Sequence, residues 1–357
     1  MQPADRHRLG GLDALRGLAA ICVAIWHWHN FFVTPSTGWM QEPTSALPFY
    51  SLLRVVYTNG DWAVDLFFTI SGFVFFYLYA KPIAADKVSA GQFAMWRFSR
   101  LYPLHFCTLM LVATLQMCYL HANGRFFVYQ TNDPGHFAAQ FVFASSWWPG
   151  DFSFNGPIWS VSIEALLYVS LFILARGGRT GPITCVAAVA VGCVAFYLHP
   201  LLGRGIVSFY LGGATFLAFE APTARNLFAV SVASVLTLAA RWPVHGLLHA
   251  ATIAAGFPLL VCMAAANNVR AQWLGQISYS SYLLHFPLQL AIVTAAAYGA
   301  PRPDFSDSTT FIAFFLLLVL LSLASFRFLE TPAQNWLRHR FVTYREPKPI
   351  KASARVG

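Results

Sequence analysis

Charged side chains are scarce in this sequence. Asp, Glu, Lys and Arg together make up 10% of its 357 residues, whereas a soluble domain carries about 25%. This excludes a disordered chain and a water-soluble globule, because both classes need more charge. None of the six cysteines forms a CxxC pair and all lie in apolar stretches, so neither a disulfide framework nor a zinc site is expected. GxSxG, Walker and HExxH signatures are also missing, which disfavours common hydrolase, nucleotide-binding and metalloprotease classes.

Long apolar runs dominate what remains. Apolar residues make up 57% of the chain, with 33 Phe, 14 Tyr and 11 Trp. Because a spanning helix needs roughly 20 mostly apolar residues, the sequence predicts an all-α polytopic membrane protein with about ten transmembrane helices. The predicted spans are 14–33, 61–79, 101–120, 157–175, 182–198, 205–219, 226–240, 247–266, 276–298 and 310–328.

The basic residues predict the orientation of these spans. If both termini are cytoplasmic, 18 of the 23 Lys and Arg residues fall on the inner side, as the positive-inside rule requires. The five on the outer side are Arg54, Arg125, Arg204, Arg241 and Arg302. We therefore expect a transmembrane domain over 1–335 and a basic cytoplasmic tail over 336–357. That tail is expected to contact anionic lipid and not nucleic acid.

Ionisable residues inside the first span are the strongest functional signal, because intramembrane charge is costly and needs a reason. Arg16 and His27 are 11 residues apart, so on one continuous helix they share a face about 16 Å apart. Asp13 can pair with Arg16 one turn away, whereas His29 faces elsewhere beside tryptophans. The alternative interpretation is that Arg16 anchors the helix end and His27 is a packed core histidine.

Three later spans carry further polar groups. Asp61 and Asp65 share a face near the outer side of the second span, with Asp61 also a candidate helix cap. Glu164 lies within the fourth span and needs a partner there. Tyr279, Tyr282 and His285 form a polar stripe on the ninth span, as the i, i+3 and i+6 spacing predicts.

Two arginines mark the inner end of the third span. Arg97 and Arg100 occur in "WRFSRLYPLH", where they either anchor the helix or bind an anion. Arginine offers a rigid fork of donors suited to phosphate or pyrophosphate. Glu330 and Arg327 mark the exit of the last span, where a structural role is the simpler interpretation. No metal site is visible.

Five strings in order resemble the membrane-bound acyltransferase-3 family of bacterial polysaccharide O-acyltransferases. They are "LDALRGLAA" followed by His27, "DLFFTISGF", "RFSRLYP", "WSVSIE" and "YSSYLLHFPL". Each string is weak alone, but together they cover nearly the whole chain in family order. Many relatives carry a C-terminal SGNH hydrolase-like domain, which is not seen in this sequence.

The resemblance implies transfer of an acyl group, usually acetyl, from cytoplasmic acyl-CoA to a hydroxyl of a carbohydrate. Acyl-CoA is then a donor substrate and not a bound cofactor. The acceptor could be an exopolysaccharide, O-antigen, glucan or lipid-linked sugar, and the location is the bacterial inner membrane. The family's required residues carry over to Arg16, His27, Arg97 and Arg100, and its WS-x-x-x-E glutamate to Glu164.

A mechanism follows from both lines of reasoning. Arg97 and Arg100 would hold the CoA phosphates, while Arg16 guides the thioester or stabilises its oxyanion. His27 would act as general base or carry the acyl group as an acyl-imidazole. Asp65 or Glu164 would orient an imidazole or bind acceptor hydroxyls. The competing class is a proton-coupled transporter or permease, because intramembrane Asp, Glu and His also build proton relays.

Overall fold

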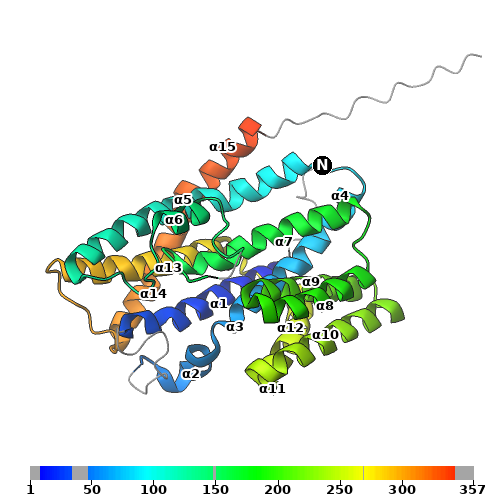
Figure 1. Ribbon diagram of the computed structural model, residues 1–357, viewed down its shortest axis with the longest axis horizontal. Helices are drawn as coiled ribbons and strands as arrows, with labels where there is room; N and C mark the ends of the chain where they lie inside the picture. Colours follow the sequence, from blue (N-terminus) through cyan, green and yellow to red (C-terminus); the bar gives the residue numbers. More distant parts are fainter. Residues whose placement is uncertain (1–8, 34–46, 148–149, 268, 342–357) are drawn as a thin grey trace, which may run out of the picture.

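The computed structural model describes residues 9–33, 47–147, 150–267 and 269–341. These residues form helices joined by turns and loops, drawn along the chain from blue to red in Figure 1. Residues 342–357 lie outside this part of the chain, so the expectation for most of the basic tail stays a prediction.

Eight helices in the described part of the chain are long and apolar enough to cross a membrane. They are Trp62–Ala84 (α3 Trp62–Phe75, a π-helical turn Phe76–Ala80, α4 Lys81–Ala84), α5 Ala90–Asn123, Gly156–Arg176 (ending in α7 Trp159–Arg176), α9 Pro200–Glu220, α10 Ala224–His245, Leu247–Ala266 (α11 Leu247–Ala251, α12 Phe257–Ala266), α13 Gln272–Ala297, and Ser308–Phe341 (α14 Ser308–Ser325, α15 Thr331–Phe341). The two other predicted spans coincide with α8, Pro182–Leu198, and with α1, Gly10–Trp26, which continues as a 3-10 turn over His27–Phe32. The prediction of an all-α polytopic membrane protein is confirmed.

Several helix bounds differ from those that hydropathy predicts. α5 begins at Ala90, well before the predicted start at 101, because Ser89 and Gln92 form a reciprocal capping box. Arg97 and Arg100 therefore project from a helix. Two further helices, α2 Tyr50–Asn59 and α6 Pro134–Phe141, lie in segments predicted as loops.

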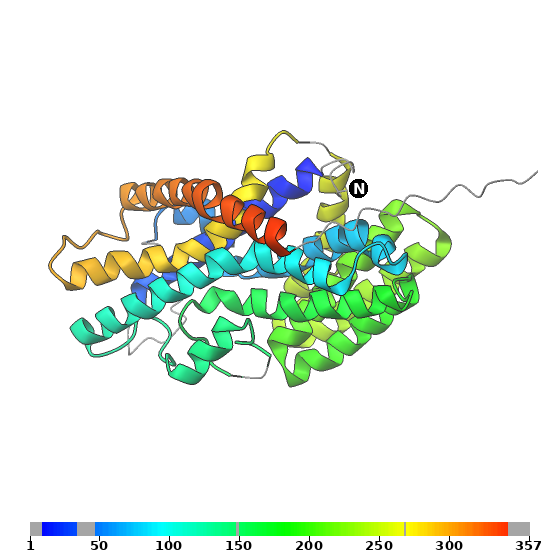
Figure 2. The same ribbon diagram turned by 90° about the horizontal axis from the view of Figure 1, so that it is seen from above.

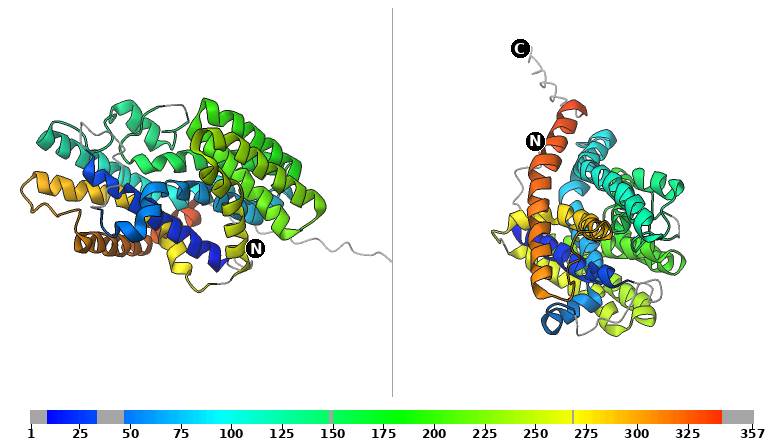
Figure 3. Two further views of the ribbon diagram at one scale, coloured as in Figure 1. Left: turned by 90° about the horizontal axis from the view of Figure 1, so that it is seen from below. Right: turned by 90° about the vertical axis from the view of Figure 1, so that its left-hand side faces the viewer.

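The helices form an elongated bundle. α1 and α13 run side by side through its middle, with α5 and α7 roughly along the same long axis (Figure 1). α8, α9 and α10 pack together on one side, and α14 contacts α13 on another (Figures 2 and 3). Helices from both halves of the sequence thus surround α1 and α13.

The approach of α3 to α9 depends on glycine at two positions. A Cβ at Gly72 would overlap the backbone of Phe209, and one at Gly212 would overlap the backbone of Thr69. Small residues allow such close backbone contact between membrane helices. The glycines of the "SGF" and "LGG" strings therefore allow the backbones of α3 and α9 to pack in direct contact.

Ion pairs gather several helix ends at one end of the bundle. Lys81 pairs with Glu220 at 2.7 Å, and Asp86 pairs with Arg176. These residues belong to segments that the positive-inside rule predicts to be cytoplasmic. The orientation itself, including that of both termini, stays a prediction.

Candidate active site

A cavity of about 260 Å³ lies between α1, α3, α5, α7 and α13. Its walls are mostly aromatic and aliphatic, but three arginines, one carboxylate, three serines and four tyrosines also face it. The polar lining residues are Arg16, Arg97, Arg100, Glu164, Ser71, Ser160, Ser278, Tyr79, Tyr168, Tyr279 and Tyr282. We call this the inner cavity. It brings together Arg16, Arg97, Arg100 and Glu164, as the sequence interpretation requires.

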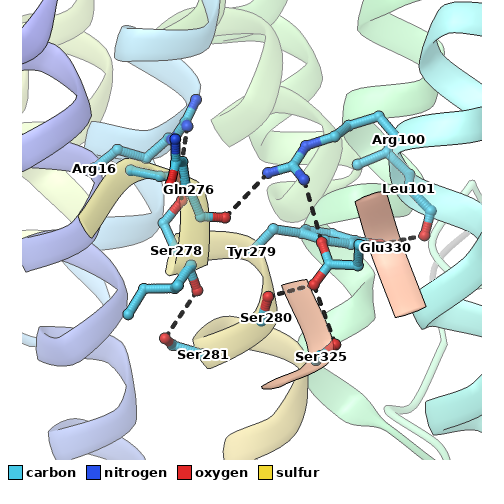
Figure 4. Close-up of polar contacts among 12 residues, drawn as sticks. Arg16, Arg100, Leu101, Gln276, Ser278, Tyr279, Ser280, Ser281, Ser325 and Glu330 are labelled. Carbon is cyan, nitrogen blue, oxygen red and sulfur yellow. Dashed lines mark hydrogen bonds and ion pairs between the residues drawn. The ribbon is translucent and has the colours of Figure 1, made fainter. Parts of the chain in front are cut away.

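Arg16 is fixed by the first turns of α13. Its Nε donates to Ser278 Oγ at 3.0 Å and its Nη2 to the carbonyl oxygen of Gly275 at 2.7 Å. The predicted pair with Asp13 is present at 3.4 Å. The guanidinium is thus held in one orientation across the α1–α13 interface (Figure 4).

Arg100 approaches α13 from the opposite side, as Figure 4 shows. It pairs with Glu330 at 3.2 Å and donates to the carbonyl oxygen of Gln276 at 3.4 Å. Glu330 in turn accepts hydrogen bonds from Ser280 and Ser325. The last span therefore contains a buried carboxylate that positions Arg100, which is more than a helix-exit role.

Arg97 is held by aromatic side chains. Its Nη2 donates to the Tyr79 hydroxyl at 2.7 Å, and the guanidinium lies 4.9 Å from the Phe75 ring centre. Cation–π contact of this kind stabilises a desolvated guanidinium. Its buried Nε has no hydrogen-bond partner among the described residues, so Arg97 keeps a donor available for an anion.

Glu164 lies deeper on α7. It accepts a hydrogen bond from Ser71 at 2.6 Å, which joins α7 to α3. A carboxylate placed this way can accept a second hydrogen bond from a ligand hydroxyl or amide, because it has several lone pairs. The inner cavity thus offers an acceptor beside its cationic donors.

A second cavity, of about 240 Å³, adjoins the first. We call it the outer cavity, because the positive-inside rule predicts that this part of the bundle lies away from the cytoplasm. Its lining is rich in aromatic rings and includes one histidine and one Asp–Arg pair. The residues are Val23, Trp26, His27, Asp61, Val64, Tyr129, Phe152, Gly156, Pro157, Trp159, Leu201, Arg204 and Tyr282.

His27 sits where α1 changes from α-helix to a 3-10 turn. Its Nδ1 lies 2.9 Å from the carbonyl oxygen of Val23. A carbonyl can only accept, so Nδ1 carries the proton and Nε2 carries the lone pair. Gln289 donates to the His27 carbonyl at 2.8 Å, and Trp28 donates to the Phe305 carbonyl at 3.0 Å. Arg16 lines the inner cavity and His27 lines the outer cavity.

A second imidazole packs against His27. The ring centres of His27 and His285 are 4.7 Å apart with a tilt of 38°. His285 is fully buried, and neither of its ring nitrogens has a hydrogen-bond partner among the described residues. His29, by contrast, turns away and contacts the Tyr57 ring of α2. The two histidines of the first span thus have different surroundings.

Asp65 lies in neither cavity. Its carboxylate is fully buried and accepts from Arg204 at 2.7 Å, from Arg241 at 2.9 Å and from Ser208 at 2.9 Å. Arg204 also contacts Asp61, which does reach the outer cavity. The structure therefore places Asp61 where the sequence interpretation had placed Asp65.

Two contributors were interpreted differently from the sequence. Glu330 was given a structural role at the helix exit and Arg204 was counted among the outer-side basic residues, and both lie far along the chain from the residues they contact. The signal available for Arg204 was intramembrane charge, but the predicted sixth span began at 205 and left Arg204 in a loop, whereas α9 begins at Pro200. A predicted span that began at Pro200 would have identified Arg204 as an intramembrane charge. No group of three or more His, Cys, Asp and Glu among the described residues is placed to hold a metal ion.

The lining of the two cavities indicates what class of reaction this bundle is suited to. A membrane-embedded bundle with a cationic pocket next to a histidine-containing aromatic pocket can bind an anionic donor and an uncharged acceptor side by side. Such an arrangement suits group transfer within the bilayer.

Comparison with known proteins specifies the class. Residues 9–327 match the family described as "Acyltransferase domain", the acyltransferase-3 family. The chain therefore belongs to this family and is a multi-pass membrane acyltransferase, so a proton-coupled transporter is not the preferred class.

Two curated relatives support this membership. The chain is 31% identical over 185 residues to "Protein 2 in picA locus" of Rhizobium radiobacter, which covers 50% of this chain and 84% of that protein. It is 30% identical over 205 residues to "Acyltransferase MdmB" of Streptomyces mycarofaciens, covering 53% of this chain and 46% of that relative. The chain thus spans less than half the length of the second relative. No solved structure matches.

Proposed function

We propose that this protein transfers an acetyl group from cytoplasmic acyl-CoA to a carbohydrate hydroxyl at the bacterial inner membrane. The observation that carries the proposal is the adjacency of the two cavities, one with three arginines and one with His27. The donor occupies the inner cavity and the acceptor the outer cavity.

Donor binding is assigned to the arginines. The CoA phosphates need multi-donor cations, and guanidinium forks bind phosphate oxygens in pairs. Arg97 and Arg100 meet this need at the helix end predicted to be cytoplasmic. Arg338 of α15 adds a third cation there, because its Nε donates to Ser99 Oγ at 3.2 Å on α5. Arg16, deeper in the bundle, is placed to stabilise negative charge on the thioester oxygen.

Acceptor binding is assigned to the aromatic outer cavity. Trp26, Trp159 and Phe152 offer flat apolar faces, while Asp61 and Arg204 offer polar groups. Arg204 also lies over the Trp159 ring at 5.6 Å, which fixes both. Aromatic faces with a few convergent polar groups are typical of small-molecule sites and suit a sugar ring with its hydroxyls.

The chemistry uses His27 Nε2 as the base. It takes the proton of the acceptor hydroxyl while the oxygen attacks the thioester carbon. The new C–O bond forms, the C–S bond breaks, and the proton passes from His27 to the CoA sulfur. In the alternative route Nε2 attacks the thioester carbon, the C–S bond breaks, and the CoA thiolate leaves with the proton that Nδ1 releases. The acceptor hydroxyl then attacks the acyl-imidazole, the C–N bond breaks, and the hydroxyl proton returns to the ring. Glu164 orients the donor, and Asp65 acts through Arg204.

The test uses membranes with wild type, His27→Ala or His29→Ala, supplied with acetyl-CoA radiolabelled in the acetyl group. Loss of a positioned base lowers the rate by about 10²–10⁴-fold, so His27→Ala should form almost no base-labile product. His29→Ala is the matched control and should retain most activity, since His29 faces α2. Equal rates in all three proteins would exclude His27 from the chemistry.

A second experiment tests the donor assignment. Arg97→Gln and Arg100→Gln should raise KM for acetyl-CoA, whereas Arg176→Gln should not. Arg176 is a suitable control because it lies at the same end of the bundle but is exposed and pairs with Asp86. Unchanged KM in the two cavity variants would place the CoA phosphates elsewhere.

A further inference from the structure

The inner cavity is too small to hold a whole acyl-CoA molecule. Its volume is about 260 Å³, whereas pockets that enclose a drug-sized molecule measure roughly 300–1,000 Å³, and acyl-CoA is larger than most such molecules. Along acyl-CoA the thioester and pantetheine arm come first, then the diphosphate, and the ribose 3′-phosphate and adenine last. If the thioester end fills the cavity, the nucleotide end therefore lies outside it, beyond Arg97 and Arg100.

Arg338 lies outside the cavity lining, where α15 packs against α5. Its Nε donates to Ser99 Oγ at 3.2 Å, and Ser99 stands between Arg97 and Arg100 along α5. Ser99 is buried, and its own hydroxyl proton is used toward the carbonyl oxygen of Trp96. The serine thus fixes Arg338 to the same turn of α5 that carries the two cavity arginines.

The positive charge at this place exceeds the negative charge beside it. Arg100 pairs with Glu330 (Figure 4), but neither Arg97 nor Arg338 has a carboxylate partner in the described part of the chain. Each of these two donates to a neutral hydroxyl instead. Arg338 is also repelled by the charges of Arg97 and Arg100. Because half-buried cations without a counter-charge are unfavourable, a bound anion would stabilise this group of arginines.

Arg338 has hydrogen-bond donors left for such an anion. Among the described residues only its Nε is used, and a guanidinium carries further N–H donors on its two Nη atoms. These donors form a planar fork that matches the oxygens of a phosphate. The side chain is half-buried and not enclosed, so a ligand that leaves the cavity can reach it.

We propose that Arg338 binds the ribose 3′-phosphate of the acyl-CoA donor and makes this protein prefer acyl-CoA to thioesters that lack that phosphate. This rests on the proposed function. Arg97 and Arg100 line the cavity and take the diphosphate, because the diphosphate is nearer to the thioester. The order of the cations, from the cavity outward, then matches the order of the phosphates along the donor. The phosphate of an anionic lipid has the same chemistry, and the experiment separates the two sources.

The experiment compares acetyl-CoA with acetyl-dephospho-CoA, which lacks only the ribose 3′-phosphate. The affinity of the purified full chain for each is taken from the rise in denaturation midpoint with donor concentration, since a bound ligand stabilises the folded state. Wild type should bind acetyl-CoA about tenfold more tightly, as expected for hydrogen bonds between charged groups. Arg338→Gln should lose this factor for acetyl-CoA and bind acetyl-dephospho-CoA as wild type does.

Three further variants serve as controls. Arg340→Gln removes the same charge from the same helix, at an exposed position two residues on, and should keep the wild-type preference. Arg338→Lys keeps the charge without the fork and should retain part of the preference. Arg100→Gln should weaken both donors by the same factor, because both carry the diphosphate.

The outcomes separate this inference from the function on which it rests. If wild type binds both donors equally, or if Arg338→Gln keeps the wild-type preference, the assignment of Arg338 is overturned while acyl-CoA stays the donor. Weakening of both donors by the same factor in Arg338→Gln also overturns it, and is the result expected if Arg338 binds a lipid phosphate. If neither donor stabilises wild type, the proposed function fails and the inference fails with it.

Discussion

The buried Asp65 cluster gives a quantitative prediction. Asp65→Asn keeps the shape of the side chain and removes its charge. Arg241 then loses the one carboxylate that it pairs with in the described part of the chain, where its Nε and Nη1 already have no partner. Breaking one side of a buried ion pair costs about 3–5 kcal/mol. We expect a marked fall in the thermal denaturation midpoint of the detergent-solubilised protein. Size-exclusion chromatography of heated samples measures this midpoint.

Two further variants sharpen this test. In Asp65→Asn/Arg241→Gln both charges are absent, so part of the loss should be recovered, with a coupling of about 0.5–3 kcal/mol. Asp61→Asn should cost less, because its carboxylate is partly exposed and lies 3.4 Å from Arg204. If Asp65→Asn were as stable as wild type but inactive, Asp65 would act in the chemistry and the structural reasoning would be refuted.

Three other changes have definite expected outcomes. Glu330→Gln removes the partner of Arg100, so KM for acetyl-CoA should rise more than kcat falls in steady-state kinetics; an unchanged KM would count against the role of Glu330 in positioning Arg100. Gly72→Leu should abolish accumulation of folded protein, measured by size exclusion, since even a Cβ there meets the α9 backbone. His136 and backbone amides lower the pKa of Asp133, the cap of α6. The stabilisation is therefore present above the usual Asp pKa and lost as pH falls through the lowered value, so the protection factors of the α6 amides, which correct for the intrinsic exchange rate at each pH, should fall on acidification.

Hydropathy was sufficient to predict the helical membrane fold, because each span is a long apolar run. The predicted ends of the spans were less accurate, since capping residues and charged turns determine where a helix begins and ends. Ser89 extends α5 past two arginines, and a window that rejects charge stops at 101. The same effect shortened α9 and hid Arg204 inside a predicted loop.

The candidate site was predictable where its residues share a helix. The Arg16–Asp13 pair follows from a three-residue spacing. Helical geometry also placed His27 deep in the first span, where its side chain lines the outer cavity. Arg100 and Glu330, by contrast, form an ion pair although they lie 230 positions apart in the chain. No local pattern encodes such a pair, because it depends on how α5 meets the π-helical turn Phe326–Glu330.

The Asp65 cluster also has a consequence for biosynthesis. Asp65 is made 139 residues before Arg204 and 176 before Arg241. At about 5–20 residues per second, the carboxylate on α3 waits roughly 7–30 s for its first buried partner. During this interval α3 must reside at the insertion machinery or in contact with water, because an isolated carboxylate is unfavourable in lipid. The burial of Asp65 as an ion pair is thus completed only when α9 and α10 arrive.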